Sequence, residues 1–163
     1  MLLYPKAYFD KIQNITIQFL IKNKIKILIL DVDNTLIDKE EILSEEVIKW
    51  TKDIKGQGVR LYILSNTNSK QKVKKVAEKL EIPYIHFAMK PFKRGFKKIQ
   101  KIVNESPERI AVVGDQIFTD IIGGNRCNMF TILVDPIKEK DYWYTAWKRP
   151  IENRIKSKIT KEK

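Results

Sequence analysis

Acidic and hydroxyl-bearing residues follow three apolar segments of the sequence, each at the point where the segment ends. They are Asp31 and Asp33 after residues 25–30, Ser65 and Asn66 after residues 59–64, and Asp115 and Asp120 after residues 110–113. Carboxylates with no histidine or thiolate nearby are hard oxygen ligands, which favour Mg²⁺ over zinc. A Mg²⁺ ion held by few protein carboxylates keeps coordination positions for phosphate oxygens. These residue types therefore point to phosphate chemistry assisted by a divalent cation.

The elements that must position these side chains are alternating strands and helices. Apolar runs of strand length cover residues 25–30, 59–64, 84–87, 110–113 and 130–134, and helical patterns cover residues 17–22, 44–55, 69–80, 92–103 and 119–125. This alternation is typical of an α/β fold with a parallel sheet. Because the carboxyl ends of such strands line one crevice, we expect all three polar clusters at the same edge of the sheet.

Length and composition favour a single domain over residues 1–163, with an N-terminal extension (1–24) and a basic, aromatic C-terminal tail (136–163). The chain has 163 residues, of which 43% are hydrophobic, and one cysteine. A single cysteine excludes an internal disulfide and suits a reducing compartment. No apolar run approaches the roughly 20 residues that span a bilayer. We expect a cytoplasmic protein, with peripheral attachment at the inner face of the membrane as an open alternative.

The charge of the chain is strongly positive and unevenly distributed. The net charge is +12, and residues 70–101 alone hold 11 Lys and Arg against 2 acids. A basic nucleic-acid-binding module is disfavoured, because no zinc-finger spacing, helix-turn-helix or aromatic RNA-binding motif is present. A phospho-receiver domain is also disfavoured, because the third predicted strand ends without a carboxylate. The excess charge suits attraction of phosphate, on a lysine-rich background that is not necessarily functional.

The order of the polar residues resembles the four motifs of the haloacid dehalogenase-like (HAD) phosphatases. The matching residues are Asp31 through Thr35, Ser65, Lys90, and Gly114 through Asp120. The stretches Asp31–Leu36, Lys90-Pro91 and Gly114–Asn125 are similar to the YqeG-type branch of subclass IIIA, over about Pro5 to Val134. Thr67 departs from the Ser-Asn-Asn usual in that branch. The resemblance implies a Rossmannoid fold, with a five-stranded parallel sheet in the order 3-2-1-4-5 and helices on both faces.

The resemblance also implies a role for each matching residue. Asp31 would be the nucleophile that forms an aspartyl-phosphate, and Asp33 the general acid and base. Ser65 and Lys90 would bind the phosphoryl group, and Lys90 would offset charge in the transition state. Mg²⁺ would be held by Asp31, Asp115 and the backbone carbonyl of Asp33. Two roles are open for each of two further residues. Asp120 would act on the metal through a water molecule or orient Lys90. Asn66 would contact phosphate or cap the helix at 69–80.

Spacing between the motifs leaves no room for a cap domain. Residues 37–58 suffice for a flap and one helix, and residues 67–89 for one helix and one strand. An open site suits a bulky phosphorylated substrate. The YqeG-type branch is similar to phosphatidylglycerophosphate (PGP) phosphatases, which places a lipid phosphate first. A soluble sugar phosphate or nucleotide is the alternative, with a homo-oligomer covering the site.

Aromatic residues of the tail stand beside basic ones. They are Tyr142, Trp143, Tyr144 and Trp147, followed by Lys148 and Arg149. Such a mixture suits the headgroup region of an anionic membrane. The competing interpretation is that Trp143 and Trp147 pack the tail onto the sheet or form a contact between subunits.

Overall fold

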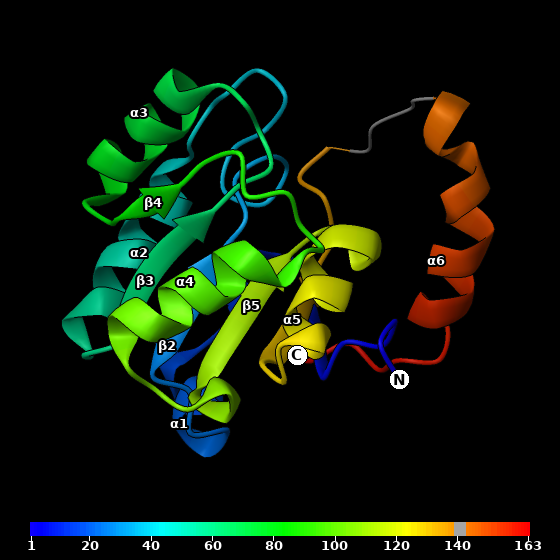
Figure 1. Ribbon diagram of the computed structural model, residues 1–163, viewed down its shortest axis with the longest axis horizontal. Helices are drawn as coiled ribbons and strands as arrows, with labels where there is room; N and C mark the ends of the chain where they lie inside the picture. The colour runs from blue at the N-terminus through cyan, green and yellow to red at the C-terminus, as the bar shows by residue number, and fades with distance from the viewer. Residues whose placement is uncertain (139–142) are drawn as a thin grey trace.

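The computed structural model describes residues 1–138 and 143–163, and the side chains of residues 1–138 and 146–163. Six parallel strands form one sheet in the order β1-β6-β5-β2-β3-β4 (Figure 1). Their bounds are Ala7–Phe9 (β1), Ile27–Leu30 (β2), Arg60–Leu64 (β3), Tyr84–Ile85 (β4), Ile110–Gly114 (β5) and Phe130–Val134 (β6). Five of these strands correspond to the five predicted ones, and their mutual order is the expected 3-2-1-4-5.

The expectation of a five-stranded sheet was wrong by one strand. Residues 7–9, placed in an N-terminal extension by the sequence pattern, form β1 at the edge of the sheet. Ala7 pairs with Ile132 and Phe9 with Val134 in a parallel register. All three residues of β1 are buried, because their side chains join the same core as those of β6. The segment before residue 25 therefore contributes one strand to the sheet.

The described residues contain six α-helices, and three of them start at a residue whose side chain caps them. Their bounds are Ile17–Lys22 (α1), Glu45–Gly56 (α2), Lys70–Leu80 (α3), Lys93–Val103 (α4), Ile122–Arg126 (α5) and Arg149–Lys156 (α6). The side chains of Thr16, Ser44 and Ser69 accept hydrogen bonds from the first-turn N–H groups of α1, α2 and α3. Such caps satisfy N–H groups that have no partner within the helix. Helix α4 has no side-chain cap, since Phe92 occupies that position.

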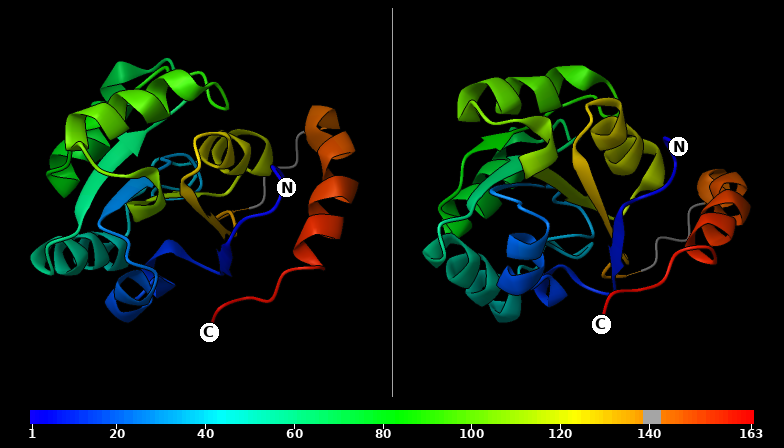
Figure 2. Two further views of the ribbon diagram at one scale, coloured as in Figure 1. Left: turned by 60° about the horizontal axis from the view of Figure 1, so that its bottom comes forward. Right: turned by 90° about the horizontal axis from the view of Figure 1, so that it is seen from below.

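The helices cover both faces of the sheet, as Figure 2 shows end-on. Leu28 and Leu30 of β2 face α1, α2 and α3, whereas Ile27 and Ile29 face α4. This alternation follows from the two-residue period of a strand. Both faces of β2 are fully buried, which explains why its sequence is apolar at every position. The central strand is thereby fixed on both sides directly before the Asp31 position.

The C-terminal helix α6 lies at the edge of the molecule, beside the N-terminal segment (Figure 2). Ile155 of α6 is buried against Tyr8, Ile117, Ile121 and Leu133. Asp135 strengthens this contact by accepting hydrogen bonds from Tyr8 and Lys156. None of the helices in the described part of the chain has the length and hydropathy that a membrane span requires. Of the tail aromatics, Tyr142 and the side chains of Trp143 and Tyr144 lie outside what is described.

Candidate active site

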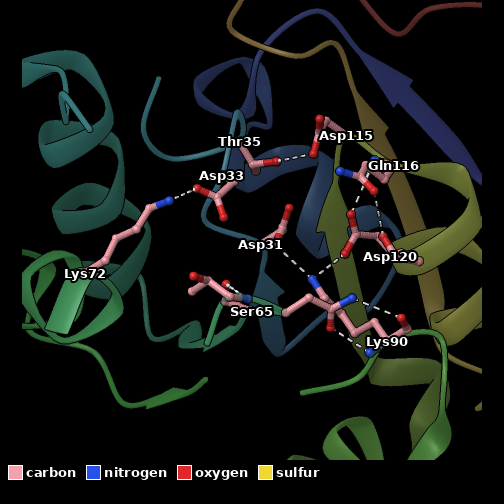
Figure 3. Close-up of polar contacts among 12 residues, drawn as sticks. Asp31, Asp33, Thr35, Ser65, Lys72, Lys90, Asp115, Gln116 and Asp120 are labelled. Carbon is pink, nitrogen blue, oxygen red and sulfur yellow. Dashed lines mark hydrogen bonds and ion pairs between the residues drawn. The ribbon is translucent and has the colours of Figure 1, made fainter. Parts of the chain in front are cut away.

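The three polar clusters lie together at the carboxyl edge of the sheet, as expected from parallel strands. Strand β2 pairs with β3 on one side and with β5 on the other. The residues that follow these strands, Asp31, Ser65 and Asp115, consequently face a common space (Figure 3). The Asp31 N–H donates to the carbonyl of Val113 at 3.0 Å, which extends the β2–β5 ladder into the site. Regular strand pairing thus positions the proposed nucleophile.

Lys90 is the buried cation of the site. Its side chain is 2% exposed, and its Nζ donates to Oδ1 of Asp31 at 2.8 Å and to Oδ1 of Asp120 at 2.6 Å. Buried ammonium groups are costly unless they are paired and hydrogen-bonded. Burial acts to lower the pKa of Lys90, but the charges of Asp120 and Asp31 outweigh it and raise that pKa above its usual value. The two carboxylates therefore favour the charged form of Lys90.

Asp120 accepts a hydrogen bond from Lys90, which is the contact that one of its two expected roles requires. It lies in a short π-helical turn, Ile117–Ile121, and its Oδ2 accepts the backbone N–H of Gln116 at 3.3 Å. A Cβ atom at residue 114 would overlap the Asp120 carboxylate, so the close approach requires Gly114. Burial, and next the charge of Asp31, raise the pKa of Asp120 to about 7, against the opposing charge of Lys90.

Three carboxylates of the site can hold a metal ion. Asp31, Asp115 and Asp120 each offer an oxygen atom, and these atoms lie within 4.8 Å of one another. Oδ1 of Asp115 also accepts the hydroxyl proton of Thr35 at 3.3 Å, which orients it. One ammonium cannot balance three carboxylates, so a bound cation would relieve their mutual repulsion. The all-oxygen donor set fits a hard divalent cation.

Ser65 and Asn66 follow β3 and shape the loop opposite Asp120. Ser65 is fully buried, and its Oγ accepts the N–H of Thr67 at 3.2 Å, which leaves the hydroxyl proton for another acceptor. The Asn66 amide bonds both backbone groups of Lys90, at 2.6 Å to the N–H and 3.0 Å to the carbonyl. Ser69, rather than Asn66, caps α3. Asn66 thereby ties the Ser65 loop to the lysine.

Sequence reasoning did not single out Lys72 as a site residue. Its Nζ forms an ion pair with Oδ1 of Asp33, the proposed acid and base. Lys72 is in the first turn of α3, and both side chains are partly exposed. The only sequence signal was its position in the helix that follows Ser65. Figure 3 shows Lys72 and Lys90 on two different sides of Asp31, so two ammonium groups flank the space beside this carboxylate.

The described segments between the motifs form no separate cap domain. All residues between Leu30 and Lys90 are described, and they form a loop with two isolated bridges, then α2, β3, α3 and β4. The bridges join Ile37 to Asp33 and to Leu43, which makes residues 33–43 a short flap. Asn34 supports the turn with a left-handed backbone, φ 58°.

Comparison with known proteins identifies the family of this site. A family model described as mitochondrial PGP phosphatase matches residues 1–138. The chain belongs to this PGP phosphatase family. It is also 34% identical over 159 residues to the Bacillus subtilis protein named Probable phosphatase YqeG, covering 97% of this chain and 92% of that one. The predicted resemblance to YqeG-type HAD phosphatases is confirmed, and the chain is a phosphatase.

Solved structures share the fold of this PGP phosphatase family member. An uncharacterized protein from Listeria monocytogenes serotype 4b superposes with a TM-score of 0.59 at 18% identity, over 72% of this chain and 85% of that one. A Streptomyces avermitilis protein described as a HAD family hydrolase superposes with a TM-score of 0.52 at 20% identity, over 68% of this chain and 67% of that one. At these identities the likeness shows the HAD-like fold alone.

Proposed function

We propose that this phosphatase hydrolyses the terminal phosphomonoester of a PGP-like lipid through an aspartyl-phosphate on Asp31, with Mg²⁺ as cofactor. The observation that carries the proposal is the buried Asp31–Lys90–Asp120 ion network at the carboxyl edge of β2 and β5. The buried ammonium holds the Asp31 carboxylate in one orientation, which suits a nucleophile. Asp31 and Asp115, with the backbone carbonyl of Asp33, would hold Mg²⁺, which supplies charge neutralisation for phosphoryl oxygens.

The chemistry divides into two displacements at phosphorus. In the first, a carboxylate oxygen of Asp31 forms a bond to phosphorus while the ester P–O bond breaks, and Asp33 gives its proton to the departing alkoxide. In the second, Asp33 takes a proton from water, whose oxygen attacks phosphorus and releases the Asp31 carboxylate and phosphate. Lys90 and the Ser65 hydroxyl donate to the phosphoryl oxygens as negative charge moves onto them.

The lipid substrate is supported by the family description and by the open flank of the site. The matching family model is described as mitochondrial PGP phosphatase. The loop of residues 31–44 and helix α2 leave the site without a covering domain, so a phosphate at a bilayer surface can reach Asp31. A soluble sugar phosphate or nucleotide is the rival substrate class, and it would require another subunit to exclude water from the site.

Turnover of a substrate panel tests this function. Purified protein with Mg²⁺ is given PGP in mixed micelles, a sugar phosphate and a nucleotide, and phosphate release is measured. We expect the highest kcat/KM for PGP, loss of turnover with EDTA, and recovery when Mg²⁺ is added in excess. Hydrolysis of the soluble compounds without hydrolysis of PGP would overturn the substrate proposal.

A variant of the nucleophile tests the mechanism separately. We expect Asp31→Asn to lower kcat by about 10³-fold or more, because the amide cannot attack phosphorus. Asp53→Asn, which alters an exposed carboxylate of α2 paired only with Lys49 at 3.6 Å, is the matched control and should keep wild-type turnover. Circular dichroism verifies that both variants are folded. Turnover above background in Asp31→Asn would refute a covalent intermediate on this residue.

A further inference from the structure

The loop that carries Lys90 exposes three large apolar side chains. Phe87 is 59% exposed, Met89 47% and Phe92 60%, whereas Ala88 and Lys90 between them are buried. Exposed apolar residues are ordinary when scattered singly, but a cluster on one loop marks a contact surface. These three residues are called the lysine-loop surface below. They flank the cation of the active site on both sides in the sequence.

The backbone holds this surface outward in a fixed conformation. Phe87 and Met89 have left-handed backbones, with φ values of 49° and 55°. This region is uncommon for bulky residues, and such outliers concentrate at functional sites. The loop is also anchored, since the N–H of Phe87 donates to the carbonyl of Thr67 at 2.8 Å and that of Ala88 to the carbonyl of Ser65 at 2.9 Å. The apolar side chains are thus rigidly related to the Ser65 loop.

The surroundings of the lysine-loop surface are basic. Residues 84–103 contain no Asp or Glu. Four basic residues of α4 next to Phe92 are exposed: Lys93, Arg94, Lys97 and Lys98. Two copies of such a face would repel each other, whereas an anionic lipid surface attracts it by about 1 kcal/mol for each basic residue close to the bilayer. Charge therefore selects lipid over self-association as the occupant.

We propose that Phe87, Met89 and Phe92 insert into the headgroup boundary of an anionic bilayer, with the basic residues of α4 on the phosphates around them. Apolar wedges beside basic side chains are how peripheral proteins bind membranes. Because the loop contains Lys90 and is bonded to the Ser65 loop, this contact places the mouth of the active site at the headgroup level. The proposal rests on the lipid substrate proposed above and names the surface that reaches it.

A double variant removes the two aromatic side chains of the surface and is chosen to keep the fold. Asn tolerates a left-handed backbone, so Phe87→Asn keeps the loop conformation. Serine is a favoured N-cap, so Phe92→Ser suits the first turn of α4. Ile102→Ser is the matched control, because Ile102 is 59% exposed on the same basic helix but lies at its far end. Thermal unfolding verifies that each variant is folded.

Binding is measured by co-sedimentation with vesicles of phosphatidylglycerol and phosphatidylcholine, which carry no phosphomonoester. We expect wild type and Ile102→Ser to bind equally, and Phe87→Asn/Phe92→Ser to bind about tenfold or more weakly, since loss of one buried aromatic side chain alone has that effect. Vesicles without phosphatidylglycerol should bind wild type poorly. Equal binding of the double variant and wild type would overturn the proposal.

Hydrolysis distinguishes failure of this surface from failure of the proposed function. For each protein, kcat/KM for PGP in vesicles is divided by kcat/KM for a short-chain soluble analogue. This ratio should be at least tenfold lower for the double variant than for wild type. Vesicle binding without PGP hydrolysis by wild type would refute the substrate and leave the surface standing. PGP hydrolysis with an unchanged ratio in the variant would refute the surface alone. Light scattering adds a further test: a dimer that the double variant converts to a monomer would refute the lipid assignment.

Discussion

Lys90 is the residue on which the electrostatics of the site depend. Its ammonium contacts two carboxylates that come from distant parts of the sequence, Asp31 after β2 and Asp120 after β5. Both carboxylates are buried, so neither can be stabilised by bulk water. The lysine therefore has a structural role in the resting protein as well as the proposed role at phosphate.

Replacement of Lys90 by methionine tests that structural role. We expect Lys90→Met to lower the free energy of unfolding by about 3–5 kcal/mol in EDTA, because the two buried carboxylates lose the ammonium group that pairs with both. The double variant Lys90→Met/Asp120→Asn should recover part of that loss, since only one buried charge then remains. Urea unfolding measures both values.

The control for Lys90→Met is Lys72→Met, which removes the partly exposed ion pair with Asp33. We expect a change of about 1 kcal/mol or less there, because solvent screens exposed pairs. Equal losses in Lys90→Met and Lys72→Met would contradict the account of a buried ion network.

Sequence reasoning located most of the candidate site but few of its contacts. Asp31, Ser65 and Asp115 could be placed together because strand ends of a parallel sheet share one edge. The pairing of Lys72 with Asp33 could not be predicted, since it depends on how α3 is rotated against the flap. The contact of Asn66 with the Lys90 backbone likewise depends on the course of a loop.

Among the elements, α4 starts in an unusual way. Phe92 stands at its N-cap with φ −66° and ψ 143°, the extended conformation that a serine cap adopts, yet it offers no acceptor to the helix N–H groups. Serine caps α2 and α3 in the same molecule. The N-terminus of α4 therefore lacks the stabilisation that a side-chain cap would give.

Phe92→Ser as a single variant is expected to stabilise the protein. A new cap should add about 1 kcal/mol to the free energy of unfolding, or about 2–4 °C to Tm for a chain of this size. Differential scanning calorimetry measures the change, with Ile102→Ser as the reference for loss of an exposed apolar side chain from α4. A lower Tm in Phe92→Ser would show that packing of the ring outweighs the missing cap.

Long periodic helices and the strands β2 to β6 were predictable because their patterns are local. Val73, Val76, Ala77 and Leu80 recur at helical spacing and are all buried in α3. Strand β1 was missed because three residues carry no period, and its pairing partner β6 is over 120 residues away in sequence. The left-handed residues of the lysine loop were missed for a related reason: neither is Gly or Asn.

For the whole molecule, Asp135 joins the two ends of the described chain. Its carboxylate accepts hydrogen bonds from Tyr8 in β1 and Lys156 in α6, and Lys161 lies 2.8 Å from its Oδ2. Burial acts to raise the pKa of Asp135, but the hydrogen bonds from Lys161, Tyr8 and Lys156 prevail and lower that pKa below its usual value of 3.8. This network stabilises the packing of the tail on the sheet edge.

The depressed pKa of Asp135 predicts a pH-dependent contribution to stability. A carboxyl group that binds protons less readily when folded stabilises the protein fully above its unfolded pKa, and that stabilisation is lost as pH falls through the lower, folded value. We expect Asp135→Asn to lower the free energy of unfolding by about 1 kcal/mol at pH 7, after allowance for solvent screening. The difference from wild type should shrink below pH 3.8.

Thermal unfolding of wild type and Asp135→Asn from pH 7 to pH 3 measures this difference. Asp53→Asn serves as the control, because the Asp53 side chain is exposed on α2 and pairs with Lys49, four residues before it. A gap between wild type and Asp135→Asn that stays constant across the range would contradict the assignment to ionised Asp135.

The position of β1 has a consequence for how the protein is made. Its partner β6 is more than 120 residues downstream, and the carbonyl of Tyr8 accepts the N–H of Glu162 at 2.7 Å. During synthesis, β1 must therefore wait for more than 120 further residues before it can pair with β6. Contacts between such distant segments form slowly and leave apolar strands exposed in the meantime. The sheet edge that β1 completes is the part of this protein that depends most on protection of the nascent chain.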